Sequence, residues 1–389
     1  MMKKPLHLYS LILLLSTTFI PSLQAQEKSF GASRINADRS VTFIYNDPTA
    51  KEVTLFCDCE LEKETTEILS EDYNKVKMHK DSNGVWTYTT PPMAPEVYTY
   101  QIQADKRRFP DPSNPDSIRV HDERRSVFII AGTPQTDLYL CEKLRGRVDT
   151  LSFRRDTTEK SRTVLVYLPP QYQQNGQQMP VLYLLHGLNG SETAWNDRGM
   201  AVQIVDNLIA QHKIIPVILV LPDVNPERLI SQDEQNIGLL ENVLCFPSWN
   251  KMEFEQCYPE MDRYLSDIYH FSTKAGSRSA AGLSAGAKQA ANLANMYDST
   301  FAAVGMFSPV INHKQYPENH FTYYWVAGGK SDFFYSSISH YCNVLKRKEV
   351  PHTAYLTTGG HTWRNWRIYL TAFLLERYDI QHSESQYSK

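Results

Sequence analysis

A serine stands at the centre of the sequence GLSAG at residues 282–286, which fits the pattern G-x-S-x-G. In this pattern the serine lies on a sharp turn between a strand and a helix. The short run 278–281 predicts such a strand, and the alanine-rich run 285–296 predicts a helix. The Ser284 hydroxyl would then lie beside a helix N-terminus, where developing negative charge is stabilised. Taken alone, the pentapeptide also fits a simple Gly-Ser turn.

A nucleophilic serine needs a base and an acid that orients the base, and hydrolases with this turn carry them in the order serine, acid, histidine. Six histidines follow Ser284, and only His361 lies in a glycine-rich loop just past a predicted strand. Four carboxylates lie between these two residues, and only Asp332 directly follows a buried strand. Elimination therefore predicts Ser284, Asp332 and His361 as a catalytic triad, although Asp332 also suits a helix N-cap.

The negative charge that develops in such a reaction needs hydrogen-bond donors. One expected donor is the backbone N–H of Ala285, directly after the nucleophile. The sequence HGLNG at 186–190 follows an apolar run, and we expect the N–H of Leu188 to be the second donor. His186 in this loop is an alternative base, but its place before the turn favours a ring that holds the loop through hydrogen bonds.

The rest of the chain predicts the elements that would position these groups. From residue 148 onward, apolar runs such as 180–185 and 217–221 alternate with helical patterns such as 200–210. This alternation predicts a mostly parallel sheet with helices on both faces, and the triad would lie at the carboxyl ends of its strands. Short strands separated by turns before residue 131 predict an immunoglobulin-like β-sandwich.

We therefore expect an α/β-hydrolase domain preceded by a sandwich. The expected boundaries are a signal peptide at 1–25, the sandwich at 26–131, a linker at 132–147, the hydrolase at 148–380 and a tail at 381–389. The first 25 residues combine a basic start, a short apolar core and Ala25 at a plausible cleavage position. They predict export to the periplasm or beyond, with no membrane anchor.

Composition narrows the possible functions. The 389 residues carry 40 Lys and Arg against 43 Asp and Glu, a net charge of −3, which does not favour nucleic acid as a partner. The spacing of the six cysteines does not fit a zinc site, and the expected chemistry needs neither a metal nor an organic cofactor. Sequence leaves the disulfide pairing and the oligomeric state open.

Residues 145–380 resemble the bacterial esterase D-like proteins of carbohydrate esterase family one, which include feruloyl and acetyl xylan esterases. Five segments carry the resemblance: VYLPPQY at 166–172, HGLNGSE at 186–192 with Trp195, AGLS at 281–284, GKSDF at 329–333 and GGHTW at 359–363. The family's triad corresponds to the three residues already chosen. The N-terminal part, with DPSNP at 111–115, resembles a carbohydrate-binding module of the glycogen-binding type.

The resemblance implies an exported serine carboxylesterase that removes feruloyl or acetyl groups from plant polysaccharide, such as arabinoxylan. Two departures bear on the substrate: Ala285 stands where the family usually has Met, and 223–249 matches the family poorly. A smaller residue beside the nucleophile favours a bulky acyl group, and we expect Trp195 and Trp363 to line a slot for its ring. A siderophore esterase of the enterochelin type, or an inactive glycan-binding protein with this fold, are the alternatives.

Overall fold

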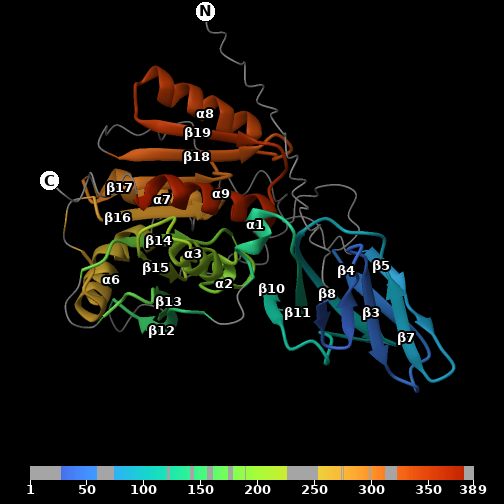
Figure 1. Ribbon diagram of the computed structural model, residues 1–389. Coiled ribbons are helices and arrows are strands. Elements are labelled where there is room, and N and C mark those ends of the chain that lie inside the picture. The colour runs from blue at the N-terminus through green and yellow to red at the C-terminus, as the bar shows by residue number, and fades with distance from the viewer. Residues whose placement is uncertain are drawn as a thin grey trace, which may run out of the picture.

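The computed structural model describes residues 28–58, 74–120, 123–140, 144–155, 161–173, 178–188, 190–225, 253–272, 274, 276–297, 299–311 and 322–380 (Figure 1). The expected signal peptide, the expected tail and most of 223–249 lie outside these residues. Inside them, every helix is too short or too polar to cross a membrane.

The N-terminal strands form two sheets whose inner faces share one apolar core. The sheet orders are β1-β2-β3-β7-β6 and β10-β11-β8-β4-β5, with β9 beside β8. The strands are β1 (Lys28–Phe30), β2 (Ser33–Ile35), β3 (Val41–Asn46), β4 (Val53–Cys57), β5 (Asn74–Lys77), β6 (His79–Lys80), β7 (Val85–Thr89), β8 (Glu96–Ala104), β9 (Arg107–Phe109), β10 (Ser117–Val120) and β11 (Glu123–Ile130). Trp86 and Tyr100 lie in the core, while Tyr88 and Tyr98 pack against it, so these aromatic rings serve the sandwich.

The C-terminal part is built on an eight-stranded sheet with the order β12-β13-β15-β14-β16-β17-β18-β19. Its strands are β12 (Arg147–Phe153), β13 (Arg162–Leu168), β14 (Val181–Leu185), β15 (Ile218–Pro222), β16 (Arg278–Leu283), β17 (Phe301–Phe307), β18 (Tyr323–Gly329) and β19 (His352–Thr357). The β12–β13 and β13–β15 pairs are antiparallel, and every later pair is parallel. The central strands are buried on both faces, which explains their unbroken apolar sequences.

Helices cover both faces of this sheet. One apolar cluster joins a face to α6 (Glu253–Tyr269), α7 (Ala285–Met296) and α8 (Tyr335–Arg347). A second cluster joins the other face to α2 (Ala194–Asp197), α3 (Ala201–Ala210) and α9 (Trp363–Arg377). The fold is therefore a mostly parallel, doubly covered sheet preceded by a β-sandwich.

The sandwich packs directly against the sheet domain. Val97, Ile118 and Val127 of the sandwich are buried in the same apolar cluster as α9. The short helix α1 (Pro134–Asp137) lies in the connection, and Figure 1 shows it close to α9, with β10 and β11 turned toward α2. One apolar cluster thus spans the boundary between the two parts, and the sandwich has a separate core of its own.

Candidate active site

Ser284 occupies a strained turn between β16 and α7. Its backbone angles are φ 54° and ψ −117°, a region that non-glycine residues rarely adopt. The turn is held because the Ser284 N–H donates to the Phe307 carbonyl at 2.9 Å. A Cβ on Gly286 would lie 2.3 Å from the His186 carbonyl oxygen, so glycine is required where the helix passes this loop. The G-x-S-x-G expectation of a strand–turn–helix thus agrees with the local backbone.

Asp332 and His361 follow β18 and β19, at the same edge of the sheet as Ser284. The His361 Nδ1–H donates to Asp332 Oδ2 at 3.0 Å, and both side chains are buried. The other carboxylate oxygen accepts the Phe334 N–H at 2.9 Å, which fixes the plane of the carboxylate. The structure therefore brings the predicted acid and base into direct contact.

The imidazole of His361 is enclosed by aromatic rings. Phe333 lies 4.6 Å from it between ring centroids, and Trp366 meets it edge-on at 4.9 Å. Among the described residues, Nε2 is buried and has no hydrogen-bond partner. Because the ring proton is on Nδ1, where it forms the hydrogen bond to Asp332, Nε2 has a lone pair that can accept a second proton.

Sequence reasoning did not find Ser308, which follows β17 between the nucleophile and the acid. It is fully buried with φ 50°, and its N–H donates to the Ala327 carbonyl at 2.8 Å. Burial alone would raise the pKa of Asp332, but the hydrogen bond and charge of His361, together with the Ser308 hydroxyl, lower it below 3.8. A positive-φ serine after a sheet strand resembles the nucleophile turn, yet no motif surrounds Ser308 in the sequence.

The loop after β14 lies against the nucleophile. A Cβ on Gly187 would lie 3.4 Å from Ser284 Cβ, and the next residue, Leu188, is half-buried. Ala285 begins α7, where the first N–H groups have no partner inside the helix. Both expected oxyanion donors therefore belong to segments adjoining Ser284.

His186 has a different environment from His361. Its Nε2 accepts the Val224 N–H at 3.0 Å, so the proton is on Nδ1, which donates to the Gly187 carbonyl at 2.7 Å. Both ring nitrogens are thus engaged by backbone groups. The ring holds the loop in place, as the sequence predicted, and has no free lone pair for a proton-transfer role.

Among the described residues, Trp195 and Trp363 do not line the expected aromatic slot, because both side chains are buried. Trp195 is 1% exposed, and its indole N–H donates to the Leu185 carbonyl at 2.9 Å. Trp363 is 5% exposed and meets Trp195 edge-on at 5.3 Å between ring centroids. Both rings belong to the apolar cluster that includes α9, and Trp363 also contacts Trp366 and Arg198, so neither ring is open to a substrate.

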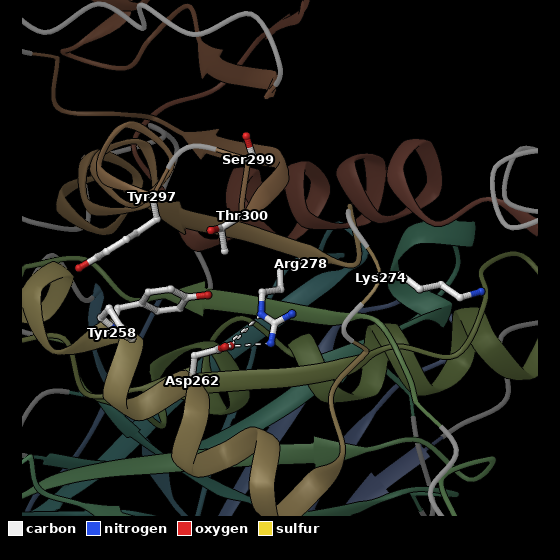
Figure 2. A pocket seen from close by; sticks show the side chains of 8 residues that line it. Tyr258, Asp262, Lys274, Arg278, Tyr297, Ser299 and Thr300 are labelled. Atoms are coloured by element: carbon white, nitrogen blue, oxygen red, sulfur yellow. Dashed lines mark hydrogen bonds and ion pairs between the residues drawn. The ribbon is translucent and has the colours of Figure 1, made fainter. Parts of the chain in front are cut away.

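A separate hollow of about 370 Å³ lies where β16 and β17 begin, at the opposite edge of the sheet. Figure 2 shows Arg278 and Asp262 paired within it. The guanidinium donates to both carboxylate oxygens, and Asp262 also accepts from the Tyr183 hydroxyl at 2.7 Å. Its described lining residues include neither a histidine nor a cysteine, and the described residues hold no cluster of three metal-ligating side chains.

Two family models match the chain. Residues 156–340 match the model described as putative esterase, and residues 29–118 match carbohydrate-binding module 48, the isoamylase N-terminal domain. An endo-1,4-beta-xylanase/feruloyl esterase of Xylanibacter ruminicola is 37% identical over 149 residues. That match covers 37% of this chain and 20% of the relative, so the chain spans only a fifth of that protein's length.

Solved structures share the fold. An enterobactin esterase from Shigella flexneri has a TM-score of 0.56 at 16% identity and covers 90% of this chain and 95% of its own. A ferulic acid esterase from the anaerobic fungus Anaeromyces mucronatus has a TM-score of 0.51 at 21% identity and covers 61% of this chain and 95% of its own. At these identities the likeness concerns the fold.

The family models and the relative together make this chain similar to hydrolases of the carboxylesterase class, with a sandwich similar to a carbohydrate-binding module at its N-terminal end. Within that class, the chain resembles the feruloyl esterases of carbohydrate esterase family one that carry such a module.

Proposed function

We propose that the protein is a serine carboxylester hydrolase that acts through an acyl-enzyme. The observation that carries the proposal is the state of His361: Nδ1 is held by Asp332, while the buried Nε2 has no partner among the described residues. An imidazole fixed in this tautomer is ready to take a proton from a neighbouring hydroxyl. The strained turn offers Ser284 as that hydroxyl.

In the proposed reaction, Ser284 Oγ attacks the ester carbonyl carbon while His361 Nε2 takes the serine proton. The N–H groups of Ala285 and Leu188 stabilise the tetrahedral oxyanion. Collapse of this intermediate breaks the ester C–O bond, and His361 returns the proton to the departing alcohol. Water, deprotonated by His361, then attacks the acyl-enzyme and releases the acid. Asp332 stabilises the imidazolium in both halves.

We further propose that the acid released is a hydroxycinnamate, such as ferulate, and that the alcohol is a plant polysaccharide. The 37% identical relative named as a xylanase/feruloyl esterase and the carbohydrate-binding-module match support this choice over other esters. Ala285 adds support from the site, because a larger residue there would fill space beside the nucleophile.

A siderophore ester is the second candidate, because the enterobactin esterase structures cover both domains of this chain. Such a substrate is anionic and needs free basic groups near the triad. Arg198, Arg228 and Lys288 are the candidates for such groups. Arg198 lies over the Trp363 ring at 5.2 Å, and the charge of Lys288 acts on Glu255. Arg228 lies outside the described residues. Both described basic residues thus already interact with other side chains, which favours the hydroxycinnamoyl ester over an anionic siderophore ester.

The two candidates separate in one experiment. The protein is incubated with feruloylated arabinoxylan, acetylated xylan and a tri-catecholate ester, and products are identified by mass spectrometry. We expect ferulate to be released fastest. The matched variant Ala285→Met should lower kcat/KM for methyl ferulate more than for a small acetate ester. Preferential cleavage of the tri-catecholate would replace the proposal with the siderophore reading.

We also propose export with cleavage after Ala25, from the sequence of residues 1–25 alone. N-terminal sequencing of the mature protein should begin at Gln26. An intact Met1 on the protein recovered outside the cytoplasm would contradict it.

A further inference from the structure

An ion pair crosses the boundary between the sandwich and the sheet domain. Glu96 begins β8, and its Oε1 accepts from Arg367 Nη2 of α9 at 2.7 Å. The two side chains are 12% and 5% exposed. Arg364, on the same helix, reaches the other oxygen at 3.4 Å but is 50% exposed. The buried contact between Glu96 and Arg367 is therefore the stronger of the two.

The Arg367 guanidinium also binds two other segments. Its Nη1 donates to the Arg198 carbonyl at the end of α2 at 2.6 Å. Its plane lies over the Tyr139 ring, 5.3 Å from the centroid, just after α1. Arg367 thus ties the first turns of α9 to the sandwich, to the interdomain connection and to α2.

The same first turns of α9 hold His361. Thr362 caps the helix by accepting the Asn365 N–H, and Asn365 Nδ2 donates to the Thr358 carbonyl at 3.1 Å. Trp366, the residue before Arg367, packs edge-on against the imidazole. A shift of this end of α9 would therefore move the imidazole relative to Asp332.

We propose that Glu96, a residue of the N-terminal sandwich, is a positioning residue for His361 and acts through Arg367 and α9. The proposal rests on the catalytic role assigned to His361 above. Without Glu96, the buried Arg367 guanidinium has no carboxylate partner, which is energetically costly. We expect α9 to shift so that the guanidinium can reach water. Small displacements of a catalytic group lower the chemical step more than substrate binding.

The test compares Glu96→Ala with Arg364→Ala, which removes only the exposed partner. Steady-state hydrolysis of a chromogenic acetate is measured well below the unfolding temperature of each protein. We expect Glu96→Ala to lower kcat by about 10- to 100-fold with KM changed less than about twofold. Arg364→Ala should stay within about twofold of wild type. Glu96→Gln keeps an oxygen acceptor for Arg367 and should recover part of the lost kcat.

A spectroscopic signal separates positioning from general destabilisation. The proton shared between His361 Nδ1 and Asp332 gives a downfield proton NMR resonance, which should shift or broaden in Glu96→Ala and persist in Arg364→Ala. An unchanged resonance and kcat within twofold of wild type in folded Glu96→Ala would overturn the proposal. Failure of the esterase assignment appears differently, as a wild-type protein without ester hydrolysis, and the NMR comparison still tests Glu96.

Discussion

Polar side chains lie at both ends of the strands of the large sheet, but their hydrogen bonding differs. At the edge where β16 and β17 begin, the Arg278 guanidinium and the Asp262 carboxylate satisfy each other. At the end where the parallel strands finish, Ser284 has a strained backbone, and His361 Nε2 has no hydrogen-bond partner among the described residues. A hollow alone therefore does not identify the proposed active site. What distinguishes that site is a serine on a strained turn together with a histidine that a carboxylate orients and whose Nε2 has no partner among the described residues.

The largest contrast should separate the two buried histidines at the reactive edge. We expect His361→Ala to lower kcat by about four to six orders of magnitude, since triad members act as a unit. His186→Ala removes only loop contacts, so it should cost far less in kcat and lower the melting temperature. Stopped assays with a chromogenic acetate and thermal unfolding measure both. Equal losses of kcat in the two variants would contradict the assignment of His361 as the base and of His186 as a residue that only holds its loop.

Asp332→Asn should rank next, with kcat lowered by about 10⁴-fold, because the amide favours the wrong imidazole tautomer. Asp298→Ala is the matched control, as the other aspartate between Ser284 and His361, and should retain near-wild-type activity. If Asp298→Ala were inactive while Asp332→Ala remained active, the acid would be misassigned.

The same carboxylate makes stability depend on pH. The pKa of Asp332 is lowered from 3.8 in the folded protein, so its charged form contributes stability that is present above pH 3.8. That contribution is lost as the pH falls through the lower folded value. The difference in free energy of unfolding between wild type and Asp332→Asn should therefore shrink across this window. Urea unfolding at pH 5, 4 and 3 measures it, and a constant difference would contradict the lowered pKa.

Ser308→Ala should have a moderate effect, with kcat lowered about tenfold, a difference of about 1.4 kcal/mol in the barrier. The buried hydroxyl has no hydrogen-bond partner among the described residues, but its proximity helps to lower the pKa of Asp332, so the acid-unfolding difference should change with it. Ser277→Ala removes another buried hydroxyl, near the start of β16, and should leave kcat unchanged. If Ser308→Ala and Ser277→Ala lowered kcat equally, the loss would come from altered packing and not from the Asp332 carboxylate.

The smallest kinetic effect is expected from Asp262→Ala, which leaves Arg278 without its carboxylate. Loss of one partner of a largely buried pair costs stability, and we expect about 2–3 kcal/mol. The melting temperature should fall by several degrees, while kcat/KM stays within about twofold. A large kinetic loss at temperatures where the variant is folded would make the hollow in Figure 2 part of the reaction.

Local patterns and chain order were enough to predict that Ser284, Asp332 and His361 lie at the carboxyl ends of sheet strands, with the last two in contact. Ser284 has a motif, and Asp332 and His361 each directly follow a strand, so elimination could pick them before any geometry was known. The contacts that surround them lack such signals. Ser308 lies near Asp332 only because the sheet places β17 between β16 and β18. Glu96 contacts Arg367, which is 271 positions later in the chain. For Trp195 and Trp363 the sequence suggested a substrate contact, but both rings are buried in the structure. The sequence does not reveal which faces of a ring are covered by other side chains.

The apolar cluster shared by the two parts of the chain has a consequence for how the protein can change over evolutionary time. Val97, Ile118 and Val127 are as much part of the α9 layer as of the sandwich. A different sandwich in its place would have to reproduce that surface and an acid at the position of Glu96. The sandwich is therefore not freely interchangeable, because the side that faces the sheet domain must be inherited together with α9.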